Sequence, residues 1–263
     1  MTDPNALDGL APPERRQRAR GHAAARAGIA SQVASRRLPG AILLHGPMGI
    51  GKATFAFEMT AAILTATGDE DAHRVEEQIA ALSHPNVSLL RRRPKDAKSY
   101  YTVIRVEDVR QLRDGLHHTR GRAGHRVAII DSIDDCNPSA ANALLKTLEE
   151  PPAHVLLLLT TAQEEALLST IRSRCRRLEV RPLSEDRLVA VLTEEHSVAP
   201  EDARLLARIS GGRLGWAIAA ATNPRLLEER QVRFDTLLQV LDGGLERRFQ
   251  YAQELAQQFS RDR

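Results

Sequence analysis

The sequence predicts an α/β protein with a parallel sheet, followed by a part that contains only helices. Three observations support this prediction. Up to residue 182, short apolar runs alternate with segments of helical periodicity, which is typical of parallel sheets covered on both faces. A glycine-rich loop follows the first apolar run, and after Pro182 only helical patterns remain.

The elements of the α/β part follow one another at short intervals. Apolar runs of four or five residues have the length of buried strands, and Gly and Pro clusters separate them from the helices. Asn137 and Pro138 form an N-cap followed by proline at the first helical position, and Pro151 ends that helix. The expected order is helix 22–37, strand 41–44, helix 53–65, helix 71–82, strand 87–90, helix 106–117, strand 127–130, helix 138–150 and strand 155–159.

The composition excludes several classes of protein. The chain has 263 residues, 42% of them hydrophobic, and its longest apolar run, Val155–Leu159, is far shorter than a membrane-spanning helix of roughly 20 residues. The N-terminus has no apolar signal segment. Two cysteines are too few for a disulfide framework or a four-thiolate zinc site. Disorder, membrane insertion and export are therefore poor interpretations, and we expect the chain in the cytoplasm.

The charge gives no sign of a nucleic-acid-binding protein. The net charge is only +3, from 37 basic and 34 acidic residues, and the basic excess is confined to the stretch before Leu38. We interpret this stretch as a solvated helix face rather than a DNA-binding patch. The run Arg91–Arg93 is interpreted in the same way, as an exposed strand end.

A phosphate-binding loop is the first motif that carries chemistry. Residues 46–52 match G-x-x-x-x-G-K between a strand and a helix, which is the context such a loop requires. Glycines let backbone N–H groups face phosphate oxygens, and Lys52 would reach the β- and γ-phosphates. A plain glycine-rich turn is the less favoured alternative. The predicted nucleotide-binding residues are Gly46, Pro47, Gly49, Gly51, Lys52, Ala53, Thr54, Asp131 and Thr160.

The part of this site that would hydrolyse a nucleotide is incomplete. Ala53 stands where a Ser or Thr hydroxyl would bind Mg²⁺, and Thr54 lies about 100° further round the helix. Asp131 ends a strand and suits a Mg²⁺ site, but the next residue, Ser132, cannot act as a base near neutral pH. We therefore expect weak binding of ATP or ADP, without Mg²⁺, and no hydrolysis. Two further acids are expected to face solvent at the following turn, Asp134 and Asp135.

Three stretches, residues 38–54, 131–152 and 171–175, resemble the clamp-loader branch of the AAA+ superfamily. The end of the second stretch and the third closely match the bacterial DNA polymerase III clamp loader. The Ala53–Thr54 pair and Ser132 resemble the delta-prime subunits of that loader rather than its motor subunits.

The resemblance implies a role in an assembly that uses ATP to open the sliding clamp and place it on primed DNA. Delta-prime subunits are similar to a rigid stator, so no intrinsic catalysis is expected of this chain within the DNA polymerase III holoenzyme. The motif Ser173–Arg174–Cys175 implies an interface at which Arg174 is an arginine finger for ATP held by a neighbouring subunit. The implied partners are the gamma/tau and delta subunits, with the clamp and DNA reached through the complex, and no membrane. Without the resemblance, Arg174 would be interpreted as a surface salt-bridge residue.

The resemblance also implies a division of the chain into domains. It further implies that two features are absent, a zinc site and an arginine that senses the γ-phosphate. Residues 66–86, where many related chains carry a four-cysteine module, contain no Cys, so no zinc is expected. Arg213 is offset from the family's sensor arginine and is not expected to contact a γ-phosphate in its own subunit. The expected segments are a basic lead at 1–20, an AAA+ domain at 21–182, a helical lid domain at 183–242 and the beginning of a truncated helical collar at 243–263.

Two other functions compete with this hypothesis. An active AAA+ ATPase, either a motor subunit of the loader or a branch-migration helicase, is disfavoured by Ala53 and Ser132. A P-loop kinase would leave the all-helical tail, the helix after Asn137 and the arginine motif without a role. The leading hypothesis is a clamp-loader subunit that does not hydrolyse ATP.

Overall fold

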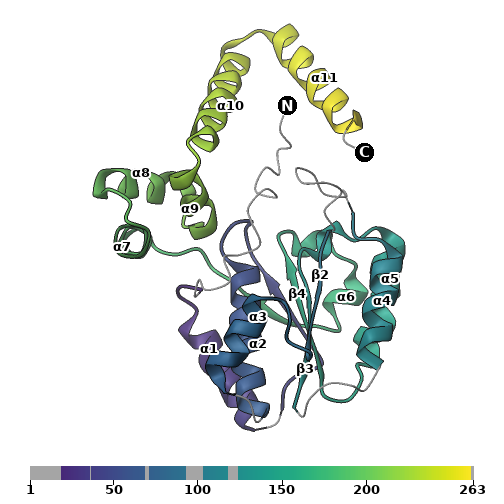
Figure 1. Cartoon of the computed structure of the whole chain (residues 1–263). Coiled ribbons are helices and arrows are strands. Elements are labelled where there is room, and N and C mark those ends of the chain that lie inside the picture. The colour runs from purple at the N-terminus through teal and green to yellow at the C-terminus, as the bar shows by residue number, and fades with distance from the viewer. Residues whose placement is uncertain (1–18, 36, 69–70, 93–102, 118–123, 262–263) are drawn as a thin grey trace.

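The protein consists of a five-stranded parallel sheet with helices on both faces, followed by a helical part (Figure 1). The computed structural model describes residues 19–35, 37–68, 71–92, 103–117 and 124–261. The predicted basic lead therefore lies almost entirely outside the described residues, as does Arg93 of the arginine run.

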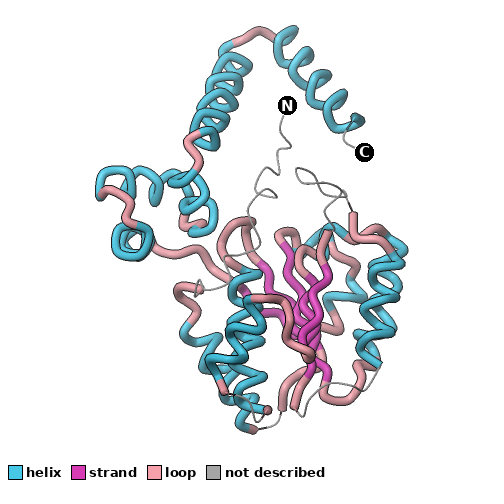
Figure 2. Tube along the Cα trace, viewed as in Figure 1, coloured by secondary structure: helices cyan, strands magenta, loops and turns pink. Residues whose placement is uncertain are grey.

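All strand pairs in the sheet are parallel, and the order across it is β2-β3-β4-β1-β5. The central strands β1 and β4 are apolar except at their carboxyl ends, because the helices bury both of their faces, which is typical of parallel sheets. Figure 2 shows the strands as one twisted layer between helical layers. The strands are β1 (Ala41–His45), β2 (Val87–Leu90), β3 (Arg126–Ile130), β4 (Val155–Thr161) and β5 (Arg176–Glu179).

Successive side chains of each strand enter different cores on the two faces of the sheet. In β4, Leu156 packs with the helices of one face and Leu157 with those of the other. Both side chains are fully buried, and each contributes about 1.5–3 kcal/mol to folding. One face carries α1 (Ala23–Ala34), α2 (Lys52–Thr67) and α3 (Ala72–Ala80), and the other carries α4 (Val106–His117), α5 (Pro138–Glu149) and α6 (Ser169–Arg172).

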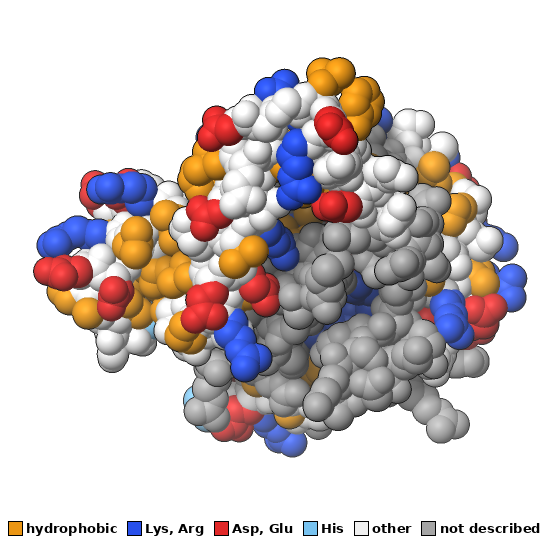
Figure 3. All heavy atoms as spheres, turned by 90° about the horizontal axis from the view of Figure 1, so that it is seen from above, with side chains coloured by type: hydrophobic (Ala, Val, Ile, Leu, Met, Phe, Trp, Pro, Cys, Tyr) orange, Lys and Arg blue, Asp and Glu red, His pale blue; other side chains and the backbone are white. Residues whose placement is uncertain are grey.

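The helical part has a core of its own around Trp216. Its last two helices expose many large apolar side chains, which alternate with charged residues on the surface seen in Figure 3. Those side chains are Val232, Phe234, Leu237, Leu238, Leu241, Leu245, Phe249 and Leu255. The helices of this part are α7 (Glu185–His196), α8 (Pro200–Ser210), α9 (Leu214–Thr222), α10 (Arg225–Asp242) and α11 (Leu245–Arg261).

The structure confirms the predicted fold class, and every predicted strand and helix of the α/β part is present within a few residues. Asn137 caps α5 as expected, since its Oδ1 accepts a hydrogen bond from the N–H of Ala140 at 2.8 Å. Among the elements that were not predicted are the four-residue helix α6 and the edge strand β5. In the part of the chain that is described, no helix combines the length and apolarity needed to cross a membrane.

Candidate functional site

The predicted nucleotide-binding residues gather at one edge of the sheet. The P-loop, residues 46–51, follows β1, while Asp131 follows β3 and Thr160 lies near the end of β4. Because β3, β4 and β1 are neighbouring parallel strands, their carboxyl ends meet at the same edge. Ligands of open α/β sheets bind at such an edge, so the strand order alone assembles the predicted site.

The backbone of the P-loop requires glycine at its first position. Gly46 has φ +148°, and a Cβ there would lie 2.3 Å from the carbonyl oxygen of Val180. Gly51 has φ +94° immediately before α2, a conformation that side chains with a Cβ rarely adopt. These two glycines let the loop turn its N–H groups toward the N-terminus of α2, where a phosphate group fits.

Lys52 closes the P-loop with its own side chain. Its Nζ donates hydrogen bonds to the carbonyl oxygens of Gly46 at 2.8 Å and Pro47 at 2.9 Å. Burial lowers the pKa of Lys52 to about 8, although the carboxylates of Asp134 and Asp131 act in the opposite direction. A phosphate that entered this loop would have to draw the ammonium away from those two carbonyls.

A hydrogen-bonded chain joins the ends of β3 and β4. Thr160 donates from its hydroxyl to Oδ1 of Asp131 at 2.8 Å and accepts from the N–H of Ser132 at the same distance. Ser132 has a left-handed backbone, φ +57°. Asp131 and Thr160 are thus brought together as predicted, and one oxygen of Asp131 already has a protein partner.

The two acids after Ser132 have structural contacts. Asp134 is exposed, as expected, yet its carboxylate also accepts hydrogen bonds from the hydroxyl of Thr161 and, at 2.7 Å, from the N–H of Ala162. Asp135 forms an ion pair with Nε of Arg92 at 3.1 Å. Both acids therefore hold the strand ends in place, a role that the sequence pattern did not indicate.

The chemistry available at this edge is phosphate binding without an evident base. Lys52 and the loop N–H groups suit a phosphate group. The donor set does not suit a resident Mg²⁺, because Ala53 has no oxygen and Oδ1 of Asp131 is engaged with Thr160. Among the described residues, no group of three or more His, Cys, Asp or Glu side chains could share a metal ion.

The helical part reaches the P-loop through the first turn of α9. The N–H groups of Gly215 and Trp216 donate to the carbonyl oxygen of Gly49 at 2.8 and 3.3 Å. A Cβ on Gly215 would lie only 2.9 Å from that oxygen, so the close approach requires glycine. Sequence reasoning missed this residue, because a single Gly near a helix start does not reveal what it contacts.

Arg213 lies outside the predicted nucleotide site. Its Nε donates to the carbonyl oxygen of Ser210 at 2.7 Å, and its guanidinium lies 5.6 Å from the ring centre of Trp216. Arg230 lies near the same ring, at 5.4 Å. Burial, and then the charge of Arg230, lower the pKa of Arg213. Its contacts are thus with its own helical part, in keeping with the expected offset from a sensor position.

The arginine motif lies at the opposite end of the sheet from the P-loop. In the parallel register, Arg176 of β5 is paired with Ile42, near the beginning of β1. Arg174 precedes β5, whereas the P-loop follows the end of β1. About six residues of extended chain separate these positions along the strand, or roughly 20 Å. Arg174 is therefore far from the nucleotide site of its own chain.

The three residues of this motif have different environments. Ser173 and Arg174 are exposed, and the Arg174 guanidinium forms an ion pair with Glu149, with 2.6 Å between Nη2 and Oε1. Cys175 is buried beside Ile171 in the core formed with α5. Burial raises the pKa of the Cys175 thiol to about 12. The motif thus combines an exposed cation with a buried anchor.

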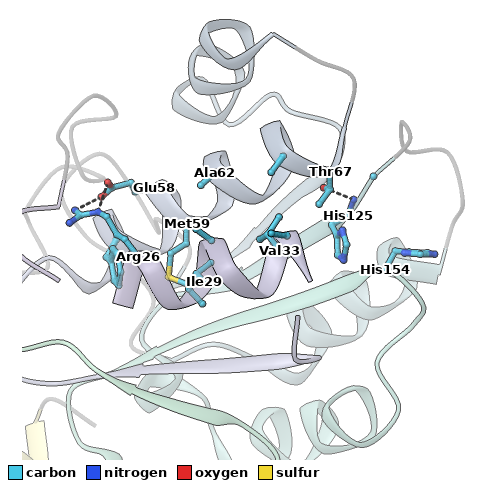
Figure 4. A pocket seen from close by; sticks show the side chains of 14 residues that line it. Arg26, Ile29, Val33, Glu58, Met59, Ala62, Thr67, His125 and His154 are labelled. Carbon is cyan, nitrogen blue, oxygen red and sulfur yellow. Dashed lines mark hydrogen bonds and ion pairs between the residues drawn. The ribbon is translucent and has the colours of Figure 1, made fainter. Parts of the chain in front are cut away.

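A pocket of about 930 Å³ lies on another part of the molecule, between α1 and α2 (Figure 4). Apolar side chains such as Ile29 and Met59 line it, with the ion pair of Arg26 and Glu58 at one end. His125 lies at its other end, and burial lowers the pKa of that imidazole. None of the residues that line this pocket belongs to the predicted nucleotide site.

Comparison with known proteins gives a consistent set of relatives. A family model described as "DNA polymerase III, delta subunit" matches residues 21–184. The DNA polymerase III subunit delta' of Pseudomonas aeruginosa is 38% identical over 139 residues, which are 51% of this chain and 41% of that protein. Subunit delta' of Bacillus subtilis is 31% identical over 201 residues, covering 74% of this chain and 57% of that protein. The chain spans about half the length of these curated relatives.

Other matches are to a further DNA polymerase III subunit and to a branch migration motor. The DNA polymerase III subunit tau of Escherichia coli is 38% identical over 120 residues, which are 44% of this chain and 19% of that protein. Among solved structures, the RuvB Holliday junction branch migration motor of Thermotoga maritima has a TM-score of 0.52 at 18% identity, covering 80% of this chain and 65% of that one. At that identity the likeness shows the fold alone. The matches confirm the resemblance that the sequence motifs predicted.

Proposed function

The chain belongs to the DNA polymerase III delta-subunit family, and from this membership we propose that it is a stator-type subunit of a clamp loader. In this role it helps a multisubunit assembly place the sliding clamp on primed DNA. Relatives named delta' support the choice of subunit. Its proposed partners are the gamma/tau and delta subunits, with the clamp and DNA reached through the complex, and its proposed location is the cytoplasm.

The observation that carries the proposal is the position of Arg174 relative to β1 and β5. Because Arg174 and the P-loop lie at opposite ends of adjacent strands, this guanidinium cannot serve the chain's own nucleotide site. A permanently charged planar fork suits the γ-phosphate of a nucleotide held by a neighbouring subunit. Arg174 is the residue that we assign to this role, with Ser173 and Cys175 supporting it at the interface.

The proposed subunit binds ATP or ADP weakly and does not hydrolyse it. The P-loop and Lys52 supply contacts to phosphate groups, whereas Ala53 supplies no metal ligand. Ser132 follows Asp131 where an acid would polarise the attacking water. With neither a magnesium ligand nor a base, the chain contributes to the assembly by its shape and its arginine rather than by its own turnover.

The test is the variant Arg174→Ala in a clamp loader reconstituted from this chain and its cognate partners. Arginine fingers elsewhere contribute roughly 10³–10⁵ in rate, but only one ATP site of the assembly would lose its finger. We therefore expect a partial fall in DNA-stimulated ATP hydrolysis and a larger fall in clamp loading, which requires the sites to act together. Nucleotide binding by this chain should not change.

The matched control is Arg176→Ala, since Arg176 is an exposed arginine two positions further along, on the edge strand. It should leave both rates unchanged. Both variants should fold normally, because exposed ion pairs contribute little to stability. Equal ATP hydrolysis and clamp loading by the Arg174→Ala and native loaders would refute the assignment.

A further inference from the structure

Arg174 is held by a carboxylate from a different element. Nη2 of the arginine lies 2.6 Å from Oε1 of Glu149, which is the last residue of α5. Arg174 itself lies in the turn between α6 and β5. The contact therefore joins two parts of the chain that are separated in sequence by the whole of β4, and the fold alone brings them together.

A second contact fixes the other arm of the guanidinium. Nη1 of Arg174 donates to the carbonyl oxygen of Thr170 at 2.9 Å. The backbone beneath is also anchored, because the N–H of Arg174 donates to the carbonyl oxygen of Ile171 at 3.1 Å, and both Ile171 and Cys175 are buried. With two nitrogens bonded to different partners, the plane of the guanidinium has a defined orientation.

Stability does not explain why Glu149 occupies this position. The side chains of Arg174 and Glu149 are 33% and 48% exposed, and ion pairs with that exposure contribute little to folding. Glu149 also lies at the C-terminal end of α5, where the helix dipole disfavours a negative charge. What the pair does provide is order in a long side chain that would otherwise populate many rotamers.

The ordered guanidinium keeps donors for a further partner. An arginine has five N–H groups: Nη1 donates to the carbonyl oxygen of Thr170 and, at 3.5 Å, to the hydroxyl of Ser173, while one N–H of Nη2 faces Glu149, which leaves the second N–H of Nη2 and that of Nε. Arg174 can therefore remain paired with Glu149 while it donates to an anion from outside the chain. A donor that is ordered in advance loses less side-chain entropy when that anion binds.

We propose that Glu149 is a positioning residue for Arg174, which it orients toward the γ-phosphate of ATP bound to the adjacent subunit. The proposal rests on the trans role assigned to Arg174 under the proposed function. Glu149 contacts no nucleotide. It acts only through the arginine, so its removal should matter only while the arginine is present.

The experiment compares Glu149→Ala, Glu149→Gln, Arg174→Ala and the double variant Arg174→Ala/Glu149→Ala in the reconstituted loader. The loader is assembled so that only the motor subunit next to this chain can hydrolyse ATP. Glu150→Gln is the matched control, because Glu150 is the adjacent exposed acid, and no described contact links its side chain to Arg174. The readouts are kcat and KM for ATP.

We expect Glu149→Ala to lower kcat roughly tenfold with little change in KM, within the ~10²-fold that a misplacement of about 1 Å can cost. Glu149→Gln should have a smaller effect, since its amide oxygen still accepts a hydrogen bond. The double variant should be no slower than Arg174→Ala alone, and Glu150→Gln should match the native loader. A merely structural role for Glu149 would instead slow the double variant further.

The possible failures are distinguishable. If Arg174→Ala lowers kcat while Glu149→Ala does not, the positioning role is wrong and the arginine finger stands. If Glu149→Ala raises kcat, the carboxylate restrains the arginine and the proposal is overturned. If Arg174→Ala has no effect, the proposed function fails, and the role of Glu149 fails with it.

Discussion

The N–H of Gly215 donates a hydrogen bond to the carbonyl oxygen of Gly49 at 2.8 Å, so the first turn of α9 rests directly on the P-loop. A free helix N-terminus has unpaired N–H groups that require acceptors. Here the carbonyl of Gly49 in the P-loop supplies one. The contact couples the position of the helical part to the conformation of the loop.

The substitution Gly215→Ala should weaken this contact and destabilise the protein. Its Cβ would lie 2.9 Å from the Gly49 oxygen, which is backbone and cannot move aside easily. We expect a loss of about 1–3 kcal/mol in the free energy of unfolding, measured by urea denaturation. Gly28→Ala is the control, because that position in α1 has open space around it, and it should be about 0.5–1 kcal/mol more stable. Equal stability of both variants would contradict the prediction.

The purified chain should hydrolyse ATP at a rate far below the 1–10³ s⁻¹ of ordinary enzymes. Ala53 lacks the magnesium ligand and Ser132 lacks a basic side chain. Phosphate release measured with Mg²⁺ and ATP should not differ between the native chain and Lys52→Ala, which defines the background. Turnover near 1 s⁻¹ that disappears in the Lys52→Ala variant would show an active ATPase instead.

Lys52 should make stability depend on pH in the alkaline range. Burial lowers its pKa from 10.5 to about 8 in the folded chain. Between these values the unfolded chain binds a proton that the folded chain has lost, so the free energy of unfolding rises with pH. Below about pH 8 the full cost of burying the charge is present.

The comparison that isolates this effect is with Lys52→Met. The thiols also titrate at high pH, but they do so in both proteins, so the difference in unfolding free energy between native chain and variant cancels their contribution. That difference should shift in favour of the native chain by up to ~1.4 kcal/mol per pH unit from pH 8 to 10. A difference that is independent of pH would mean that the pKa of Lys52 is not lowered.

Neither cysteine should react readily in the folded protein. Burial raises the pKa of both Cys136 and Cys175 to about 12, and the acids Asp135 and Asp134 add to the effect at Cys136. Because the thiolate is the reactive form, a chromogenic disulfide reagent at pH 8 should modify native chains slowly. In denaturant it should titrate two thiols per chain. Rapid modification of either cysteine in the native protein would contradict this.

Elemental analysis should find no stoichiometric zinc. Structural zinc sites use closely spaced cysteine pairs, whereas Cys136 and Cys175 are 39 residues apart in the sequence, and no group of three or more His, Cys, Asp or Glu among the described residues could hold a metal ion. Extensive dialysis followed by metal analysis tests the point, with a known zinc protein treated in parallel. About one zinc ion per chain would overturn the prediction.

The motifs predicted the nucleotide edge of the sheet because their signals are local. A P-loop can be recognised from a few residues, and so can an apolar strand that is followed by an acid such as Asp131. The order of the parallel strands then brings the two together. β5 was not predicted because its sequence carries no such local signal. Its sequence, Arg176–Glu179, is charged and mostly exposed, and it becomes a strand only because β1 offers it an edge to pair with.

The contacts that matter most for the proposals depend on tertiary structure. No spacing rule links Glu149 to Arg174, or Gly215 to Gly49, because each pair forms between elements that meet only after folding. The sequence predicted only that Arg213 is offset from the family's sensor arginine. It could not show that the guanidinium groups of Arg213 and Arg230 both lie near the ring of Trp216.

Because β1 and β5 pair in parallel, different groups lie at the two ends of this strand pair. The P-loop lies at one end of this strand pair and the exposed guanidinium of Arg174 at the other, so the two ends are unlike surfaces. If subunits associate through two such unlike surfaces, as the proposed function requires, the contacts are heterologous, and an open row leaves one unsatisfied surface at each terminus. Under the proposed function, a member whose P-loop does not support hydrolysis while its arginine is intact is suited to only one of those termini, and its place there sets where the row begins.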